Sequence, residues 1–234
     1  MIELEDVGFW YPGMANRALS GVTLNVTGQR VAIVGANGSG KTTLLKCISG
    51  LALPTAGTIR VDGMPVCEEN QLEIMRRVVY CPQVPDEQLS AMSVYSEVGL
   101  PLFFRDMARQ QQEVVIRQAL NRIGIGSLEK RFVGSLSPGE KKKVVLARSL
   151  VAEGSTLLVD EPTANLDPRS SREILEILDA LATEGVAVVL ATNVLPEAVA
   201  WAEEVVILKN GTVAASGTPS LLLDERVLLE TGLR

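Results

Sequence analysis

The sequence of 234 residues contains no histidine. Histidine is the general base of Ser-His and Cys-His nucleophilic sites and the most frequent metal ligand in proteins, so sites of these kinds are excluded. Any hydrolytic chemistry in this chain must therefore depend on carboxylates together with a metal ion.

Cysteine is scarce as well. The three cysteines, Cys47, Cys67 and Cys81, are too few and too scattered for a disulfide framework, and none forms the C-x-x-C pair that suggests a zinc site. We expect reduced thiols, most of them buried.

Basic residues are fewer than acidic ones. The chain has 22 Lys and Arg and 28 Asp and Glu, which gives a net charge of -6. Nucleic-acid binding depends on clustered basic residues that neutralise phosphates. The basic run at residues 141–143 is interpreted as a solvated helix face. We therefore expect no nucleic-acid partner.

Long hydrophobic runs are also missing. Although 47% of the residues are hydrophobic, no uninterrupted apolar run approaches the roughly 20 residues that span a bilayer. Residues 1–6 are acidic and lack the basic and apolar regions of a signal peptide. We expect a cytoplasmic chain that does not cross a membrane by itself.

What the sequence does contain is an alternation of short β-branched segments with helical stretches. Segments 31–34, 78–80, 157–159 and 186–190 have the apolar character of strands that are buried on both faces, and residues 41–49 are helical in pattern. This alternation indicates an α/β fold with a mostly parallel sheet.

Two regions depart from this alternation. Segments 2–9, 22–26 and 58–61 are typical of antiparallel strands joined by glycine-containing turns. Between residues 86 and 153 the strand signals disappear, and the apolar spacing of residues 114–123 becomes helical. We therefore predict a helical insert in the sheet domain.

A glycine-rich loop follows the apolar segment 31–34. The loop matches the pattern G-x-x-x-x-G-K-[ST] and opens a helix, which is the context that makes the pattern a phosphate-binding site. Its glycines permit backbone angles that aim successive N–H groups at an anion beside a helix N-terminus. The loop is formed by residues 35–42, and its predicted ATP-binding residues are Gly35, Asn37, Gly38, Ser39, Gly40, Lys41 and Thr42.

Three side chains at the end of the loop have separate predicted roles. Lys41 neutralises the β- and γ-phosphates, the hydroxyl of Thr42 ligates Mg²⁺, and Thr43 reaches an inner phosphate. The alternative is a glycine-rich turn without a ligand. With Gly near ~7% of residues, chance gives the full pattern in only about one chain in a hundred of this length.

A pair of acidic residues ends the apolar segment 157–159. Open α/β sheets place ligands at the carboxyl ends of their strands, where Asp160 fits a direct or indirect partner of Mg²⁺. Glu161 can polarise the water that attacks the γ-phosphate, as a catalytic base. By themselves such acids are often ordinary turn residues, but beside the glycine-rich loop they predict a hydrolytic site.

Together with further motifs in the same order, these elements resemble the nucleotide-binding subunit of an ATP-binding cassette (ABC) transporter over residues 2–218. Tyr11 falls where that family has an aromatic that stacks on adenine, and an edge-strand aromatic is the plain alternative. Gln83 matches the Q-loop glutamine, which by this resemblance touches Mg²⁺, takes part in catalysis and senses a membrane subunit.

The resemblance implies a P-loop NTPase core with a mostly parallel sheet, an N-terminal antiparallel β-subdomain and an inserted α-helical subdomain. It implies a single ABC ATPase domain over residues 1–234. In this division residues 1–85 and 154–234 form the nucleotide-binding core with the β-subdomain, and residues 86–153 form the helical subdomain.

Leu-Ser-Pro-Gly-Glu at residues 136–140 resembles the ABC signature Leu-Ser-Gly-Gly-Gln. In that family the signature of one subunit contacts the nucleotide of another, so Ser137, Gly139 and Glu140 are predicted to act in trans. A serine N-cap followed by proline explains the same residues as a plain helix start, and both interpretations can hold together. Asp167 resembles the D-loop aspartate, or a simple turn into the next helix.

The chain departs from the family pattern at two places. Asn193 stands where the family has its switch histidine; an amide can donate to a γ-phosphate, but it adds no charge and shuttles no proton. Pro138 removes an N–H, and Glu140 replaces the usual glutamine by a carboxylate. We therefore predict impaired rather than absent ATP hydrolysis and two unequal sites in a heterodimer, with a homodimer as the competing possibility.

Residues 83–89 are similar to the Gln-x-Pro-Asp-x-Gln-Leu stretch of energy-coupling-factor and cobalt-type importers. The resemblance implies an ATPase, with ATP and Mg²⁺ as ligands, that lies on the cytoplasmic side of the cell membrane as a peripheral subunit. It implies two kinds of partner, a second ABC ATPase subunit and transmembrane transporter subunits, and uptake of a vitamin or a metal ion.

Two other functions stay open, and a third explains only part of the sequence. A soluble ABC ATPase of DNA repair or translation is disfavoured by the acidic charge and by the short stretch between Gln83 and residue 136, which leaves no room for a long coiled-coil arm. A nucleotide-sensing module without turnover is supported by Asn193 and opposed by Glu161. A small-molecule kinase or a GTPase would explain the glycine-rich loop but not the later motifs.

Overall fold

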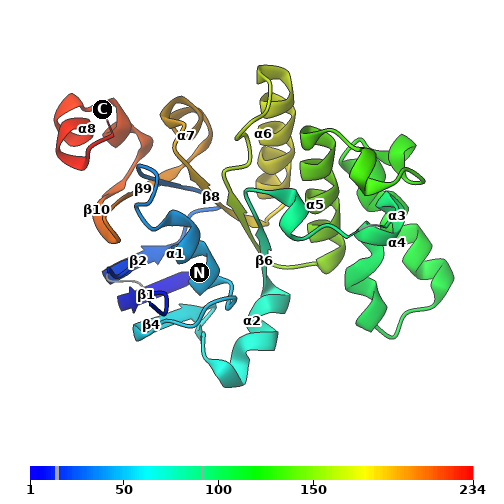
Figure 1. The fold of residues 1–234 in the computed structure, drawn as a ribbon, viewed down its shortest axis with the longest axis horizontal. Coiled ribbons are helices and arrows are strands. Elements are labelled where there is room, and N and C mark those ends of the chain that lie inside the picture. The colour runs from blue at the N-terminus through cyan, green and yellow to red at the C-terminus, as the bar shows by residue number, and fades with distance from the viewer. Residues whose placement is uncertain (14–15, 91, 234) are drawn as a thin grey trace.

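The computed structural model describes residues 1–13, 16–90 and 92–233. Its larger sheet has the strand order β10-β9-β3-β8-β7-β6, in which β10 is antiparallel to β9 and the other neighbours are parallel (Figure 1). Every residue of β7 is buried, as expected for a strand of a parallel sheet that is covered on both faces. The strands are β3 (Arg30–Val34), β6 (Val78–Cys81), β7 (Thr156–Asp160), β8 (Ala187–Thr192), β9 (Glu204–Lys209) and β10 (Thr212–Gly217).

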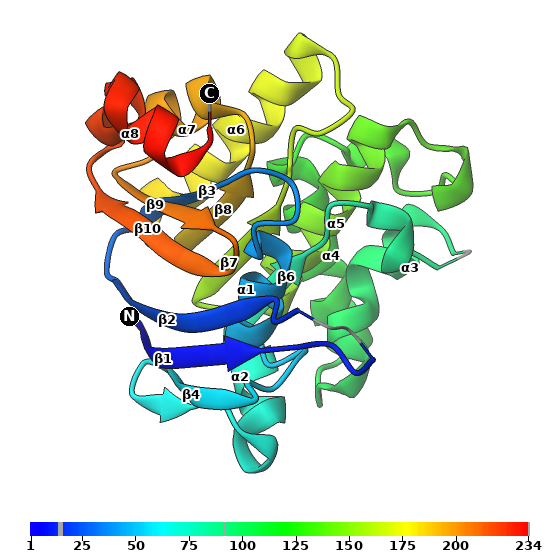
Figure 2. The ribbon, with the colours of Figure 1, turned by 60° about the vertical axis from the view of Figure 1, so that its left-hand side comes forward.

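A smaller antiparallel sheet, with the order β2-β1-β4-β5, is built from the N-terminal quarter of the chain. Strand β1 lies between its neighbours, so that Ile2 is paired with Val26 on one side and with Val61 on the other. Figure 2 shows β1, β2 and β4 as a separate layer below the larger sheet. The strands are β1 (Ile2–Phe9), β2 (Leu19–Val26), β4 (Ala56–Val61) and β5 (Met64–Pro65).

Helices cover the larger sheet and fill the space between the two sheets. Figure 1 shows α3 and α4 at the end of the molecule opposite to α8. The helices are α1 (Lys41–Ile48), α2 (Gln71–Arg77), α3 (Val94–Gly99), α4 (Arg109–Arg122), α5 (Pro138–Ala152), α6 (Pro168–Thr183), α7 (Leu195–Trp201) and α8 (Glu225–Thr231). Short 3-10 helices are η1 (Glu68–Asn70), η2 (Pro85–Glu87), η3 (Leu100–Phe104), η4 (Gly126–Leu128), η5 (Val133–Ser135) and η6 (Pro219–Leu223).

Alternating side chains of β3 divide the core. Val31 and Ile33 belong to the cluster that joins both sheets through α1, whereas Ala32 and Val34 belong to a cluster with α7 and η6. A further cluster joins α3, α4, α5 and α6 to β7 and β8. Helix α1 is therefore held between the two sheets, which fixes the glycine-rich loop in front of it at the carboxyl end of β3.

The predicted fold class is confirmed: a mostly parallel sheet, an N-terminal antiparallel sheet and a helical insert are all present. Several details differ from the sequence interpretation. It predicts no helix at α2, α7 or α8, and it begins the second N-terminal strand at residue 22, whereas β2 begins at Leu19. The division at residues 85/86 and 153/154 stays a prediction. Among the described residues, no helix is long and apolar enough to cross a membrane.

Candidate nucleotide-binding and hydrolytic site

The glycine-rich loop connects β3 to α1 in a conformation that requires glycine. Gly40, the residue before α1, has a φ of 106°, and a Cβ at Gly35 would lie only 2.5 Å from a backbone oxygen of β9. Lys41 is 6% exposed, and its Nζ donates to the carbonyl oxygens of Gly35 and Ala36 at 2.9 and 3.4 Å. The ammonium group is thus folded back over the loop, where it can face an anion held by the backbone N–H groups.

Asp160 at the end of β7 lies beside the first turn of α1. Its Oδ2 accepts hydrogen bonds from the hydroxyl of Thr42 at 2.6 Å and from the hydroxyl of Tyr80 at 3.2 Å. Its Oδ1 is buried and has no hydrogen-bond partner among the described residues. A buried carboxylate oxygen without a donor, next to a hydroxyl, is an oxygen ligand set that suits Mg²⁺.

Tyr80 is a member of this site that the sequence analysis missed. Burial raises the pKa of its hydroxyl, and the neighbouring Asp160 raises it further. The phenol therefore stays protonated and donates to the carboxylate. No sequence pattern identified it, because an aromatic residue in a buried strand is an ordinary core residue.

Glu161 turns back toward the loop instead of continuing the strand. Its φ is 44°, a left-handed conformation that is uncommon outside glycine. Its Oε1 lies 3.5 Å from Nζ of Lys41, and its Oε2 accepts a hydrogen bond from the backbone N–H of Asn193 at 3.3 Å. The carboxylate is thereby aimed into the space in front of the glycine-rich loop.

Asn193 follows β8 and faces the same space. Its side-chain amide donates to Oδ1 of Asn37 at 3.2 Å. Asn193, which the sequence analysis predicts at the switch position, therefore connects the carboxylate of Glu161 to the glycine-rich loop. It offers amide donors, but no group that can carry a proton.

Tyr11 lies near the other side of the loop. Its hydroxyl is 3.2 Å from Oγ1 of Thr43, and its ring packs edge-to-face on Phe9 with centroids 5.0 Å apart. The ring is 37% exposed, so one part of it is available to a base. Thr43 is buried and is placed by this contact.

Gln83 and Ser39 stand apart from these contacts. Gln83 is exposed two residues after β6, and none of the hydrogen bonds found among the described residues joins it to Asp160 or Thr42. The hydroxyl of Ser39 is buried without a partner in the described part of the chain. Gly38, within the loop, has a φ of 79°, and a Cβ added there would have no described atom within 4 Å.

The signature residues begin α5 as a capping box. Oγ of Ser137 accepts from the backbone N–H of Glu140 at 3.3 Å, and Oε2 of Glu140 accepts from the N–H of Ser137 at 2.7 Å. The hydrogen bond from the Ser137 backbone lowers the pKa of Glu140. Pro138 occupies the first helical position. The helix-start interpretation therefore describes what these residues do within this chain.

Asp167 similarly caps α6. Its carboxylate accepts from the backbone N–H groups of Arg169 and Ser170 at 2.9 and 3.0 Å, and the Ser170 contacts lower its pKa. A Cβ at Gly139 would lie 3.5 Å from the side chain of Ser170. The beginnings of α5 and α6 are therefore close to one another, and both are at the surface.

The two groups of predicted residues are separated in the structure. Among the described residues, no hydrogen bond or ion pair joins Ser137, Gly139 or Glu140 to the glycine-rich loop. One chain thus presents a loop with its carboxylates at one place and an exposed helix start at another.

The ABC transporter family model matches residues 19–164. The chain belongs to the ABC transporter family. This ABC chain is 35% identical over 232 residues to the energy-coupling factor transporter ATP-binding protein EcfA2 of Methanospirillum hungatei, with 98% of this chain and 58% of that protein covered. It is also 35% identical over 234 residues to EcfA of Carboxydothermus hydrogenoformans, with 100% and 86% covered.

Solved structures give the same assignment. CbiO1 from Clostridium perfringens, part of the ABC transporter complex CbiONQ, has a TM-score of 0.86 and 31% identity, with 100% of this ABC chain and 94% of that chain covered. The dimeric structure of MJ0796, a bacterial ABC transporter cassette, has a TM-score of 0.85 and 27% identity, with 94% and 99% covered. The ABC cassette fold therefore extends over the whole chain.

The prediction of a solvated basic face at residues 141–143 is wrong for this ABC chain. Lys142 is 7% exposed, and its Nζ donates to the carbonyl oxygens of Glu161 at 2.8 Å and Ala164 at 3.2 Å. Burial lowers the pKa of Lys142 to about 8. The local sequence of three lysines does not show that Lys142 faces inward. The carbonyl groups that it contacts come after β7, which is distant in the sequence.

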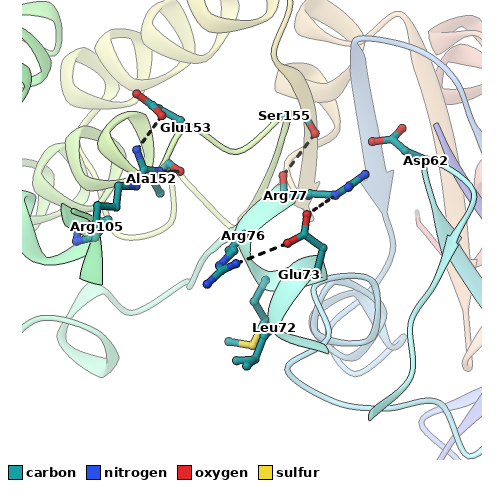
Figure 3. Close-up of a pocket in the computed structure, with 11 residues that line it drawn as sticks. Asp62, Leu72, Glu73, Arg76, Arg77, Arg105, Ala152, Glu153 and Ser155 are labelled. Atoms are coloured by element: carbon teal, nitrogen blue, oxygen red, sulfur yellow. Dashed lines mark hydrogen bonds and ion pairs between the residues drawn. The ribbon is translucent and has the colours of Figure 1, made fainter. Parts of the chain in front are cut away.

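Residues from distant parts of the ABC chain also line a surface groove of about 1060 Å³ (Figure 3). Figure 3 shows Arg105, Ala152 and Glu153 on one side and the residues of α2 on the other. An adjoining hollow includes Tyr80 and Gln88 among its lining residues. The groove is lined by Asp62, Leu72, Glu73, Met75, Arg76, Arg77, Pro101, Arg105, Ala152, Glu153 and Ser155.

Proposed function

We propose that this chain hydrolyses ATP to drive uptake of a solute by a membrane transporter of the energy-coupling factor or cobalt type. The observation that carries the proposal is the 2.6 Å contact between Thr42 and Asp160 beside the inward-facing carboxylate of Glu161. The relatives named as energy-coupling factor ATP-binding proteins support the type of transporter. A vitamin or a metal ion is the proposed cargo.

The residues of this chain have the following proposed roles. The backbone of the glycine-rich loop and Nζ of Lys41 bind the phosphates of ATP, and Tyr11 packs against the base. Thr42 and Asp160 hold Mg²⁺, with Gln83 brought in from the exposed loop after β6. When bound, the metal ion supplies charge neutralisation at the β- and γ-phosphates.

Glu161 is the proposed general base. When ATP binds, its phosphates attract the ammonium of Lys41 away from Oε1 of Glu161, and a water molecule replaces the ammonium there. The carboxylate then accepts a proton from this water molecule. Asn193 orients the carboxylate through its backbone N–H and offers its side-chain amide to the terminal phosphate. Because the amide carries no charge, we propose slow turnover.

The site is proposed to be completed by a second ABC ATPase subunit. The exposed start of α5 at Ser137 and Gly139 and the nearby Asp167 are unconnected to the loop of their own chain among the described residues, and a helix N-terminus attracts a phosphate. Glu140 holds Ser137 in place for this contact. Pro138 and Asn193 support a partner that differs from this chain.

The groove between α2 and α5 is the proposed contact with a transmembrane subunit. It offers the apolar side chains Leu72 and Met75 beside the guanidinium groups of Arg76 and Arg105, which suits a short amphipathic helix with an acidic residue. It adjoins the hollow at Tyr80, whose hydroxyl donates to Asp160, so one side chain connects this hollow to the hydrolytic site. This contact would place the chain on the cytoplasmic face of the membrane.

The test measures Mg²⁺-dependent phosphate release by the chain purified together with its partner ATPase subunit, and by the same assembly that carries the Glu161→Gln variant. We expect turnover in the unchanged chain and a loss of about 100-fold or more in the variant, with ATP affinity retained. Glu176→Gln, on the surface of α6, is the matched control and should behave as the unchanged chain. Equal turnover in both variants would show that Glu161 is not the base.

The partners are tested from membranes. A tagged chain should purify together with multi-helix membrane proteins and a second ATPase, and Leu72→Glu in the groove should lose the membrane proteins while keeping the ATPase. Recovery of the chain alone from detergent extracts of its native membranes would contradict the proposed assembly.

A further inference from the structure

Lys142 is an ammonium group held inside the protein without a carboxylate in direct contact. Among the described residues it forms no ion pair within 4.0 Å, and its hydrogen bonds go to two backbone carbonyls, those of Glu161 and Ala164. Burying a charge without a counter-ion is costly, and three carboxylates nearby, Asp160, Glu161 and Glu197, offset that cost only in part. The part of this cost that the carboxylates do not offset indicates that the buried ammonium of Lys142 has a role besides stabilising the fold.

The loop that Lys142 contacts has an unfavourable backbone. Glu161 and Asn165 both have left-handed conformations, with φ values of 44° and 62°. Within the loop, the N–H of Ala164 donates to the carbonyl of Glu161 at 3.2 Å, which is the same oxygen that Lys142 contacts at 2.8 Å. The carbonyl of Glu161 is therefore fixed by two donors.

The opposite side of the loop is attached to other elements. The N–H of Glu161 donates to the carbonyl of Ala191 in β8 at 2.8 Å, and the hydroxyl of Thr163 donates to Oε2 of Glu197 in α7 at 2.6 Å. Without Lys142, the hydrogen bonds described here between the loop and other elements would be those to β8 and α7.

We propose that Lys142 is a positioning residue, whose hydrogen bonds to the backbone of residues 161–164 hold the carboxylate of Glu161 in its hydrolytic orientation. This inference rests on the proposed ATPase function of Glu161. It assigns to α5 a role within its own chain, in addition to the role of its first residues toward a partner.

The position of Lys142 couples these two roles. Lys142 lies in the first turns of α5, two residues after Glu140 of the capping box. If a bound partner displaced Ser137, the first turns of α5 would move the ammonium of Lys142 and thereby the carbonyl of Glu161. The proposed contact with the partner's nucleotide would then be linked to the geometry of the proposed base inside one subunit.

The first experiment compares steady-state ATP hydrolysis by Lys142→Met, Lys142→Gln and Lys143→Met. Methionine keeps the length and removes the donors, whereas glutamine keeps an amide donor. Lys143 is the control, because it lies on the same helix and pairs with Glu173 on α6, away from the loop.

We expect Lys142→Met to lower kcat by about 10- to 100-fold with KM for ATP within about twofold, since small misplacement of a catalytic group has effects of this size. Lys142→Gln should recover kcat to within about threefold, and Lys143→Met should leave it unchanged. A rise in KM that matches the fall in kcat, or a glutamine variant as slow as the methionine variant, would overturn the inference.

A second measurement does not need turnover. Hydrogen exchange of the backbone amides at Ala164 and Leu166 should become at least about tenfold faster in Lys142→Met and stay unchanged in Lys143→Met. Unchanged exchange in both variants refutes the positioning role. If Lys142→Met does not fold, Lys142→Leu, which also lacks hydrogen-bond donors, provides the same comparison.

The two measurements separate the inference from the proposed function. An unchanged chain that releases no phosphate refutes the ATPase proposal, and the exchange comparison still decides whether Lys142 holds the loop. A chain that turns over normally while all three variants behave alike refutes the role of Lys142 only.

Discussion

Lys41 and Lys142 reach Glu161 from two different elements, and each is almost fully buried. Lys41 comes from the glycine-rich loop and lies 3.5 Å from the carboxylate, whereas Lys142 comes from α5 and contacts the carbonyl at 2.8 Å. A bound phosphate would compete with the carboxylate for Lys41, whereas the carbonyl is a neutral backbone group that a phosphate does not replace. We therefore expect the first contact to be exchangeable during a reaction cycle and the second to be permanent.

The largest expected effect tests the exchangeable contact. Lys41→Met should weaken ATP binding by about 10- to 100-fold, because a charge-assisted hydrogen bond to phosphate contributes about 1.5 to 3 kcal/mol. Lys142→Met should bind ATP with unchanged affinity. Titration calorimetry with ATP measures both, and an equal loss in the two variants would abolish the distinction between the lysines.

The contact of Lys142 should be visible in how the free energy of unfolding depends on pH. The pKa of Lys142 is lowered from 10.5 to about 8 in the folded chain. Between these values the unfolded chain binds more protons, so the free energy of unfolding rises with pH. Relative to Lys142→Met, we expect the unchanged chain to gain about 2 kcal/mol from pH 8 to 10.5.

Denaturant unfolding with a metal chelator present measures this gain, and other titrating groups cancel in the comparison. If the difference in unfolding free energy between the two chains stays constant over this pH range, the pKa of Lys142 is not lowered in the folded chain.

Asn193 lets the comparison be extended to the switch position. Asn193→His should raise the rate of single-turnover hydrolysis by about tenfold, because an imidazole can carry both charge and a proton next to Glu161. Rapid-quench measurement of bound ATP gives the rate. An unchanged rate would show that the amide does not limit turnover.

The smallest expected effect concerns Tyr80, which supports Asp160 as Lys142 supports Glu161. Tyr80→Phe removes one donor to Oδ2 and leaves the hydroxyl of Thr42 in place, which should cost about 1 kcal/mol of stability. The Mg²⁺ concentration for half-maximal turnover should change by about fivefold. Tyr95→Phe is the control, and an equal effect in it would argue against a specific role of Tyr80.

The sequence interpretation succeeded for motifs whose residues are close together in the sequence. The glycine-rich loop and the acidic pair are each continuous in sequence, so the sequence alone places Lys41, Thr42 and Asp160 at the carboxyl ends of two strands of one sheet. The 2.6 Å contact between Thr42 and Asp160 follows from that shared edge. The roles of these residues stay predictions until they are measured.

The interpretation failed where a side chain meets a distant backbone. Lys142 was assigned to solvent because its neighbours Lys141 and Lys143 are basic, yet the three point to different places: Asp86, the loop at Glu161, and Glu173. Helix α2 was missed because seven residues give too short a period to recognise. Such features depend on tertiary contacts rather than on local pattern.

The capping box at the start of α5 has a consequence for the subunit when it is alone. Pro138 has no N–H, and the N–H of Glu140 is taken by Ser137, so the helix start displays few free donors to water. Ser137 can still donate its hydroxyl proton while it accepts from Glu140. We therefore expect a subunit on its own to bind free phosphate only weakly at this helix start, so that the proposed contact with a nucleotide depends on a partner that holds the nucleotide close to it.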